Sequence, residues 1–176
     1  MTQSNNIMNY FEEKQFFRQK LLWIIILFFP ILSLYGIYEQ LILGNPVGDK
    51  PLTNNGLIIF SIFIGFGLPI IFWLMNLSLR ISKRGFHYMF FPIHLKEHLI
   101  SFDDIVSYKL RTYSPIREFG GWGIRYGFEC KAYTVSGNKG LEITLKNGRK
   151  ILFGSQKQSY LVKAIKSAQK SNTLLK

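Results

Sequence analysis

The chain has 176 residues, of which 48% are apolar and only 18% are charged, whereas soluble domains usually carry about 25% charged residues. The single cysteine, Cys130, excludes an intramolecular disulfide and any metal site built from several thiolates. The net charge of +12 arises entirely after residue 79, where 18 Lys and Arg face six Asp and Glu.

Residues 1–20 are mostly polar and form the predicted N-terminal cytoplasmic flank. Within them, Phe11–Lys20 is interpreted in two ways. It is either a hydrophilic lead-in to the first apolar segment or a short amphipathic helix, whose phenylalanines would enter a bilayer interface while its basic residues stay near the headgroups.

Two long uncharged segments follow, and they predict a transmembrane hairpin over residues 21–79. The first helix is expected over about 21–43, with a kink at Pro30. The second is expected over 56–79, where 24 uncharged residues would span about 36 Å as a helix, enough for a hydrocarbon core of about 30 Å. Residues 44–55 join them with Pro, Gly and Asn, the residues of turns.

Charge sets the expected orientation of this hairpin. The connecting loop has one Lys, whereas the N-terminal flank has three basic residues and the region after Leu79 has eighteen. The positive-inside rule therefore predicts a multi-pass protein with both termini in the cytoplasm. Trp23 and Trp73 fall near the expected cytoplasmic helix ends, where interfacial aromatic residues are typical. Gly65 and Gly67 are expected to allow close helix packing, with helix one or in a homo-oligomer.

After Leu79 the pattern changes to short runs typical of β-strands. Turns are expected at Arg84-Gly85 and Asp103-Asp104, and the strand over 124–135 is expected to bend at Gly127. Leu141–Leu145 alternates apolar and polar residues and precedes Asn147-Gly148, which favours a hairpin with a type I′ turn. Ser155 and Gln158 have the spacing of a capping box, ahead of a helix with an apolar stripe at Leu161, Val162, Ile165 and Ala168.

Three segments carry a family resemblance: FGGWGIR (Phe119–Arg125), KGLEITLKNGRKILFGSQ (Lys139–Gln156) and LVKAI (Leu161–Ile165). Over about Leu79 to Ala168 the chain resembles the pleckstrin-homology-like (PH-like) domains of bacterial membrane proteins with two N-terminal transmembrane helices. The resemblance implies a membrane α-helical hairpin followed by an α+β domain over 80–170 and a tail over 171–176. The domain would be a seven-stranded antiparallel β-sandwich or barrel capped by a C-terminal helix. Members of this group mostly have no assigned activity, and the fold generally serves as a platform for binding or assembly.

The HLKEH segment, His94–His98, matches the H-x-x-E-H pattern of a class of zinc hydrolases. That chemistry needs both histidines on one helix face and a third ligand, whereas this short segment follows Pro92 and favours a turn. A zinc hydrolase is therefore kept as the alternative function. No catalytic residue, cofactor or metal is expected in the leading interpretation.

The FGGWGIR loop has two interpretations. Its glycines, Trp122 and Arg125 would suit a phosphate or carboxylate ligand, or the loop is a bulge with Trp122 on the core. More broadly, the candidate surface for anionic lipid headgroups or a protein partner comprises Lys83, Arg84, Arg111, Arg117, Trp122, Arg125, Lys131, Arg149 and Lys150.

The expected function is a non-enzymatic adaptor or assembly factor in a bacterial plasma membrane, with its domain on the cytoplasmic face. Anionic lipids explain the positive charge without a nucleic-acid partner, since the sequence contains no nucleic-acid-binding motif. An unidentified membrane or cytoplasmic protein is the expected partner. A small accessory subunit of a transport complex is a further alternative, which would need partner helices to complete a pathway.

Overall fold

The computed structural model describes residues 9–173 and divides the chain into two compact units. One is the apolar segment Phe17–Met75. The other combines the residues up to Phe16 with those from Asn76 onward, so the β domain is interrupted in sequence by the hairpin. This differs from the expected domain over residues 80–170.

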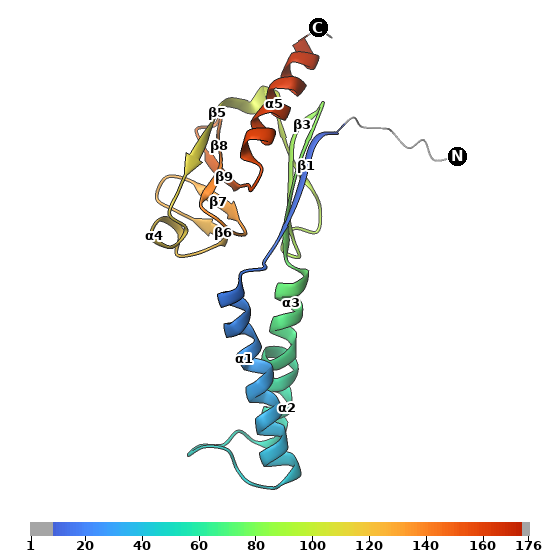
Figure 1. The fold of residues 1–176 in the computed structure, drawn as a ribbon, viewed down its shortest axis with the longest axis vertical. Coiled ribbons are helices and arrows are strands. Elements are labelled where there is room, and N and C mark those ends of the chain that lie inside the picture. Colours follow the sequence, from blue (N-terminus) through green and yellow to red (C-terminus); the bar gives the residue numbers. More distant parts are fainter. Residues whose placement is uncertain (1–8, 174–176) are drawn as a thin grey trace, which may run out of the picture. The chain divides into compact units, whose positions relative to one another are not determined.

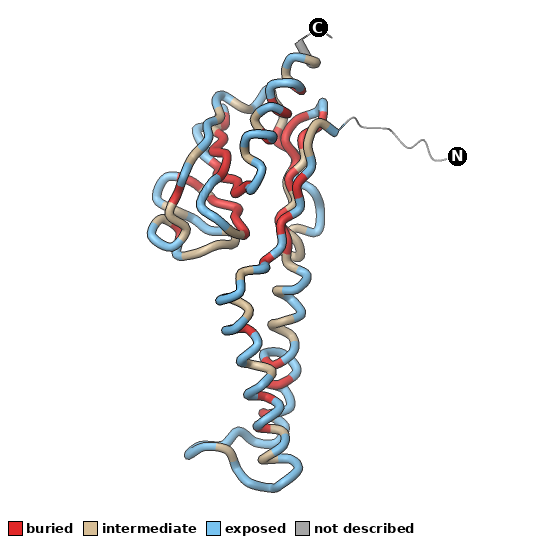
Figure 2. Tube along the Cα trace, viewed as in Figure 1, coloured by how far each residue is buried: buried red, intermediate tan, exposed pale blue. Residues whose placement is uncertain are grey.

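The hairpin unit contains two helical segments that are long and apolar enough to cross a membrane, Lys20–Ile42 and Asn54–Leu74. The first consists of α1 (Lys20–Gly36) continued by a π-helical turn η1 (Ile37–Ile42). The second consists of α2 (Asn54–Phe60), the π-helical η2 (Ser61–Gly67) and α3 (Leu68–Leu74). Most of their residues are exposed (Figure 2), so neither is a buried core helix.

The two helices pack closely at Gly65, as expected, whereas the nearest atom to a Cβ on Gly67 is Ile62 O of its own helical segment. A Cβ atom placed on Gly65 would lie 2.2 Å from Ser33 Oγ, so only glycine fits at this contact with α1. At one end of the hairpin the rings of Trp23 and Trp73 meet edge to face at 5.9 Å. The Arg18 guanidinium lies over the Trp73 ring, 4.2 Å from its centroid.

The β domain has two mostly antiparallel sheets, and Figure 1 shows the blue strand β1 beside the green strands that follow the hairpin. The first sheet has the order β1 (Asn9–Phe16), β2 (Asn76–Ser82), β3 (Gly85–Phe91), β4 (His98–Ser101). The second has the order β5 (Ile105–Thr112), β8 (Lys139–Leu145), β9 (Lys150–Gly154), β7 (Lys131–Thr134), β6 (Gly123–Tyr126).

The helices of this unit are short apart from the last. A 3₁₀ turn η3 (Phe102–Asp104) links the sheets, and α4 (Pro115–Phe119) lies between β5 and β6. The C-terminal helix α5 (Gln158–Thr173) contacts β1 and β2 of the first sheet and β8 of the second. An α+β domain with a C-terminal helix is thus confirmed. The expected seven antiparallel strands are not, because residues 9–173 form nine and β7 pairs with β9 in parallel.

The main core lies between the facing sheets and under α5. Leu77, Leu79 and Ile81 of β2 are fully buried, as are Leu161, Ile165 and Ala168 of the predicted helix stripe. Phe86 and Phe153 join the two sheets with ring centroids 4.6 Å apart. Figure 2 shows this buried interior on both sheets. A smaller cluster on the outer face of the second sheet comprises Tyr113, Phe119, Cys130, Ala132 and Leu152.

Two expectations for the ends of the hairpin are wrong. Helix two ends at Leu74, not Leu79, because Asn76–Ser82 is the central strand β2. The apolar residues of that strand alternate with Ser78 and Arg80, a period of two that the longer apolar run conceals. The segment Asn9–Phe16 is also a strand, paired to β2, and neither a loose flank nor an amphipathic helix.

Three local expectations also change. The run over 124–135 is two strands, β6 and β7, separated at Gly127. The β8–β9 turn is not type I′, since Gly148 alone has positive φ, 79°, and its N–H donates to Leu145 O, which is typical of a type I turn followed by a left-handed glycine. Helix α5 starts after the expected cap, and Ser155 instead accepts a hydrogen bond from Lys157 N.

Candidate functional site

The nine residues of the predicted lipid or partner surface do not gather on one face. Lys83 and Arg84 are exposed at the β2–β3 turn, and Arg117 is exposed on α4. Trp122 and Arg125 lie in and after the glycine loop. Lys131 and Arg149 do line a common cleft, whereas Lys150, next to Arg149, does not.

That cleft, here called the sheet-edge cleft, has a volume of about 530 Å³ and opens between the two sheets. The first sheet contributes residues of β3, β4 and the loop between them, and the second contributes residues of β7, β8, β9 and the β8–β9 turn. Its polar and aromatic lining includes Tyr88, His94, His98, Asp104, Lys131, Tyr133, Lys146 and Arg149. The volume is in the range of small-molecule sites.

Strand alternation explains which residues face the cleft. Lys131 and Tyr133 project from one face of β7, and Ile151 and Phe153 lie on the matching face of β9, where Phe153 stacks on Tyr133. Arg149 immediately precedes β9 and lines the same cleft. The residues between them on the opposite face, Ala132 and Leu152, belong to the smaller outer core. Lys150 therefore projects away from the cleft although it is adjacent to Arg149 in sequence.

Aromatic rings form one wall of the cleft. Tyr88 stacks on His98 with centroids 5.2 Å apart, and the rings of His94 and His98 are 4.4 Å apart. Tyr133 lies 5.0 Å from Tyr88, and Lys131 Nζ lies 5.0 Å from the Tyr133 ring. These contacts hold the two imidazoles and one ammonium group on a rigid, partly apolar surface.

Electrostatics favour an anion in this cleft. Three cations, Lys131, Lys146 and Arg149, face one carboxylate, Asp104. Within residues 9–173 none of these three cations forms an ion pair. Burial lowers the pKa of His94, and the nearby His98 and Lys131 lower it further, so His94 is neutral at pH 7.

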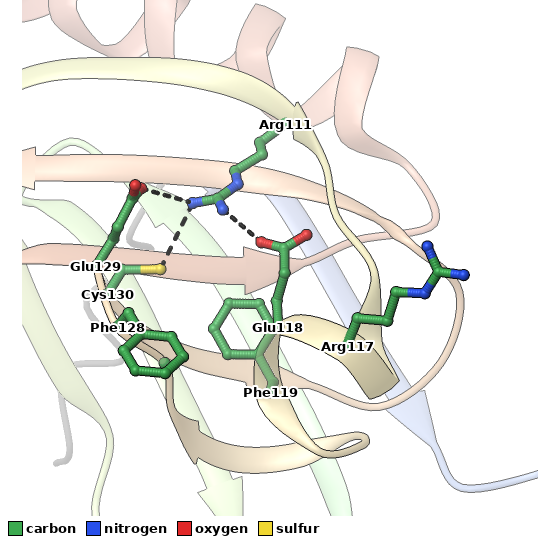
Figure 3. Close-up of a pocket in the computed structure, with 8 residues that line it drawn as sticks. Arg111, Arg117, Glu118, Phe119, Phe128, Glu129 and Cys130 are labelled. Carbon is green, nitrogen blue, oxygen red and sulfur yellow. Dashed lines mark hydrogen bonds and ion pairs between the residues drawn. The ribbon is translucent and has the colours of Figure 1, made fainter.

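A second, smaller cavity of about 210 Å³ lies on the outer face of the second sheet (Figure 3). Arg111 of β5 is bound there by Glu118 and Glu142, each at 2.5 Å, and its Nη1 lies 3.7 Å from Cys130 Sγ. Figure 3 shows Arg117 pointing away from this group. Arg111 is thus committed to internal carboxylates and is not part of a lipid-facing surface.

The Glu142 carboxylate is the buried partner of this network, with a side chain only 3% exposed. Burial by itself would raise the pKa of Glu142, but hydrogen bonds from Arg111 and Lys109 outweigh it and lower the pKa. Burial raises the pKa of the Cys130 thiol. The site therefore holds a protonated thiol beside ion-paired carboxylates, an arrangement suited to stability rather than to nucleophilic chemistry.

The conformation of the FGGWGIR loop is set by its glycines and by hydrogen bonds within the protein. Gly120 ends α4 with φ of 68°, and Gly121 and Gly123 also have positive φ. The Trp122 indole N–H donates to Gly137 O at 2.8 Å, and Arg125 Nε donates to Trp122 O at 3.1 Å. The Trp122 bond ties the loop to the β7–β8 connection, which gives the loop a structural role. Trp122 is half-buried and does not pack in the core, so the expected bulge with Trp122 on the core differs from the structure in this respect.

The HLKEH segment does not form the helix that a zinc hydrolase of this pattern needs, since His98 begins β4. His94 and His98 face the cleft, whereas Glu97 binds Arg80 and lies 3.0 Å from His87 Nδ1. Within residues 9–173 no three His, Cys, Asp or Glu side chains gather as metal ligands. The three predicted hydrolase residues are therefore divided between two sites.

Glu97 belongs instead to a hydrogen-bonded chain with His87 and Ser82, which the sequence did not predict. Ser82 Oγ lies 2.7 Å from His87 Nε2, and His87 Nδ1 lies 3.0 Å from Glu97 Oε2. The order of groups matches a nucleophile, its base and an orienting carboxylate. However, Ser82 has no exposed surface and His87 is 7% exposed, so a substrate has no access to the hydroxyl.

Comparisons with protein-family models, with curated proteins and with solved structures find no match to this chain. The resemblance to PH-like domains therefore stays a prediction, and the candidate site depends on geometry and charge alone. On both grounds the sheet-edge cleft is the strongest candidate.

Proposed function

We propose that this chain is a membrane-anchored binding protein, a non-enzymatic adaptor or assembly factor with its β domain on the cytoplasmic face of a bacterial plasma membrane. One observation carries the proposal. Phe16, the last residue of β1, pairs with Asn76, the first residue of β2. The chain thus leaves the β domain for the apolar hairpin and re-enters the same sheet at the neighbouring strand.

This pairing constrains the topology of any membrane insertion. Paired strands lie about 4.8 Å apart, so the segment Phe17–Met75 starts and ends at nearly the same point. Such a segment crosses a bilayer an even number of times, which suits its two apolar helices. The excess of basic residues after Leu79 then favours the cytoplasmic side for the whole β domain.

The short connections support an anchored domain. Only residues 17–19 separate β1 from α1, and only Met75 separates α3 from β2. The Trp23 and Trp73 pair, with Arg18 over the Trp73 ring, is at the end of the hairpin next to these connections, and amphipathic aromatic residues are typical of a headgroup boundary. The domain would therefore stay near the inner leaflet.

Cysteine accessibility tests the topology. In a Cys130→Ala background, Asp49→Cys marks the connecting loop and Lys150→Cys marks exposed β9. In intact cells we expect a membrane-impermeant maleimide to label position 49 only, with position 150 labelled after permeabilisation. Labelling of position 150 in intact cells would overturn the proposal.

Crosslinking and affinity purification of the full chain from native membranes test the adaptor role. We expect one stoichiometric protein partner. A chain recovered alone with one bound zinc, lost on His94→Ala, would instead support the hydrolase alternative.

A further inference from the structure

We propose that the sheet-edge cleft binds the phosphate group of a phosphomonoester. This deepens the proposed function by assigning a ligand class to the domain, and only the lipid source of that phosphate rests on membrane anchoring. The proposal starts from an imbalance of charge. Lys131, Lys146 and Arg149 line the cleft with Asp104 as the facing carboxylate, a formal surplus of two positive charges.

The surplus matches the charge of the ligand. A phosphomonoester carries about −1.5 to −2 charge at pH 7. A carboxylate or a phosphodiester carries one negative charge and would neutralise half of the surplus. An arginine guanidinium also forms paired hydrogen bonds with phosphate oxygens, and Arg149 is exposed at the mouth of the cleft, with its side chain available for such bonds.

The three cleft cations are not neutralised by carboxylates of the described part of the chain. Arg111, on the other face of the same sheet, is paired with Glu118 and Glu142. In contrast, within residues 9–173 the three cleft cations have no carboxylate within ion-pair distance. Burial lowers the pKa of Lys131, but the hydrogen bonds that its ammonium group donates to Tyr133 and Tyr126 outweigh this effect, so the pKa is raised and the ammonium group stays charged.

The rest of the cleft suits the group esterified to the phosphate. Tyr88, Tyr133, His94 and His98 form an aromatic wall, and the imidazoles add hydrogen-bonding atoms. A volume of about 530 Å³ holds more than a bare phosphate ion. The ligand class is therefore a small phosphomonoester, either soluble or the headgroup of a lipid.

Calorimetric titration of the full-length protein in detergent with glycerol 3-phosphate, at low salt and pH 7, tests the site. We expect saturable binding with one site per chain. Arg149→Gln should weaken binding at least tenfold, and Lys146→Gln should weaken it severalfold. Lys150→Gln is the matched control, because it removes the same charge from the adjacent residue on the opposite strand face, and we expect less than a twofold change.

Two further arms identify the source of the phosphate. The protein in neutral phosphatidylcholine nanodiscs is compared with nanodiscs containing phosphatidic acid, a phosphomonoester lipid, or phosphatidylserine, a phosphodiester lipid. Loss of glycerol 3-phosphate binding only with phosphatidic acid assigns a lipid headgroup, and unchanged binding assigns a soluble ligand.

Absence of saturable binding would overturn the phosphate site, as would equal weakening by Arg149→Gln and Lys150→Gln. Unchanged unfolding temperatures of the variants exclude misfolding as the cause. Neither negative result affects the maleimide topology test, so failure of this site is distinguishable from failure of the anchored-domain proposal.

Discussion

Glu13 and Ser155 are 142 residues apart in sequence, yet the Ser155 hydroxyl donates a 2.6 Å hydrogen bond to Glu13 Oε2. The backbone N–H of Gln156 donates to the other carboxylate oxygen at 2.9 Å. Gln15 lies two residues after Glu13 on the same strand, and its Nε2 donates to Gly154 O at 2.8 Å. The strand before the hairpin is thus bonded to the corner between β9 and α5, the last corner of the domain.

Glu13→Ala is predicted to destabilise the β domain by about 1–3 kcal/mol, because it leaves the Ser155 hydroxyl and the Gln156 amide without their buried acceptor. Thermal unfolding of the full chain in detergent measures the effect. Glu12→Ala, on the exposed face of the same strand, is the control and should change stability by less than about 0.5 kcal/mol. Equal losses for the two variants would contradict this role of Glu13.

Acid is predicted to destabilise the domain through His87. Burial lowers the pKa of His87, and Arg80 and Arg84 lower it further against the opposing effect of Glu97. Below pH 6.5 the unfolded state therefore binds more protons than the folded state, and stability falls as the pH falls. We expect a loss on the order of 1 kcal/mol between pH 7.5 and 5.5, measured as a lower unfolding temperature.

His87→Gln should reduce that pH dependence. The pH profile of His94→Gln must be measured as well, since the pKa of His94 is also lowered and its protonation contributes a loss of stability in the same range of pH. Glu97 and Glu142, whose pKa values are lowered, contribute only below about pH 4.5. A pH profile that is unchanged in both histidine variants would show that other groups control acid stability.

Arg111→Met is predicted to cost about 3 kcal/mol of stability, because it leaves the buried Glu142 carboxylate without its main partner. This loss is at the lower end of the range usual for removing one partner of a buried ion pair, about 3–5 kcal/mol, because Lys109 Nζ remains 3.2 Å from Glu142 Oε1. Arg117→Met, on exposed α4, should have little effect. If the second substitution Glu142→Met does not recover part of the loss, the charge argument is wrong.

Ser82 is predicted to be unreactive toward a fluorophosphonate probe in the native protein, although it is hydrogen-bonded to His87. Its side chain has no exposed surface, so the probe cannot approach the hydroxyl. Labelling is read by mass spectrometry of the full-length protein. Stoichiometric labelling lost in Ser82→Ala would instead establish a nucleophile and would reopen the question of enzymatic function.

Gly65→Ala is predicted to destabilise the hairpin, because its Cβ atom would overlap Ser33 Oγ. Ser33→Gly in the same chain removes the overlapping atoms and should restore most of the lost stability. Comparison of unfolding temperatures in detergent measures both. An additive loss in the double variant would contradict direct packing of these two residues.

Much of the fold follows from local sequence pattern. The length and apolarity of the two hairpin segments, the turn at Lys83 and Arg84, and the apolar stripe of α5 each depend on neighbours within a few residues. These features were predictable because a helix or strand repeats its periodicity along the chain, although the turn expected at Arg84-Gly85 lies one residue earlier, since Gly85 begins β3. The presence of Lys131 and Arg149 in a candidate surface followed in the same way, from charge alone.

Pairing between distant segments decided the rest. Asn9–Phe16 and Asn76–Ser82 are strands, contrary to the prediction, because each supplies backbone hydrogen-bond partners to the other. The same long-range order joined Lys131, Arg149, Tyr88 and Tyr133 in one cleft and moved Arg111 into an internal network. By itself the sequence determined an apolar hairpin and a basic β domain. Only the tertiary structure decided that the strands before and after the hairpin pair in one sheet, because strand pairing depends on partners that local periodicity does not specify.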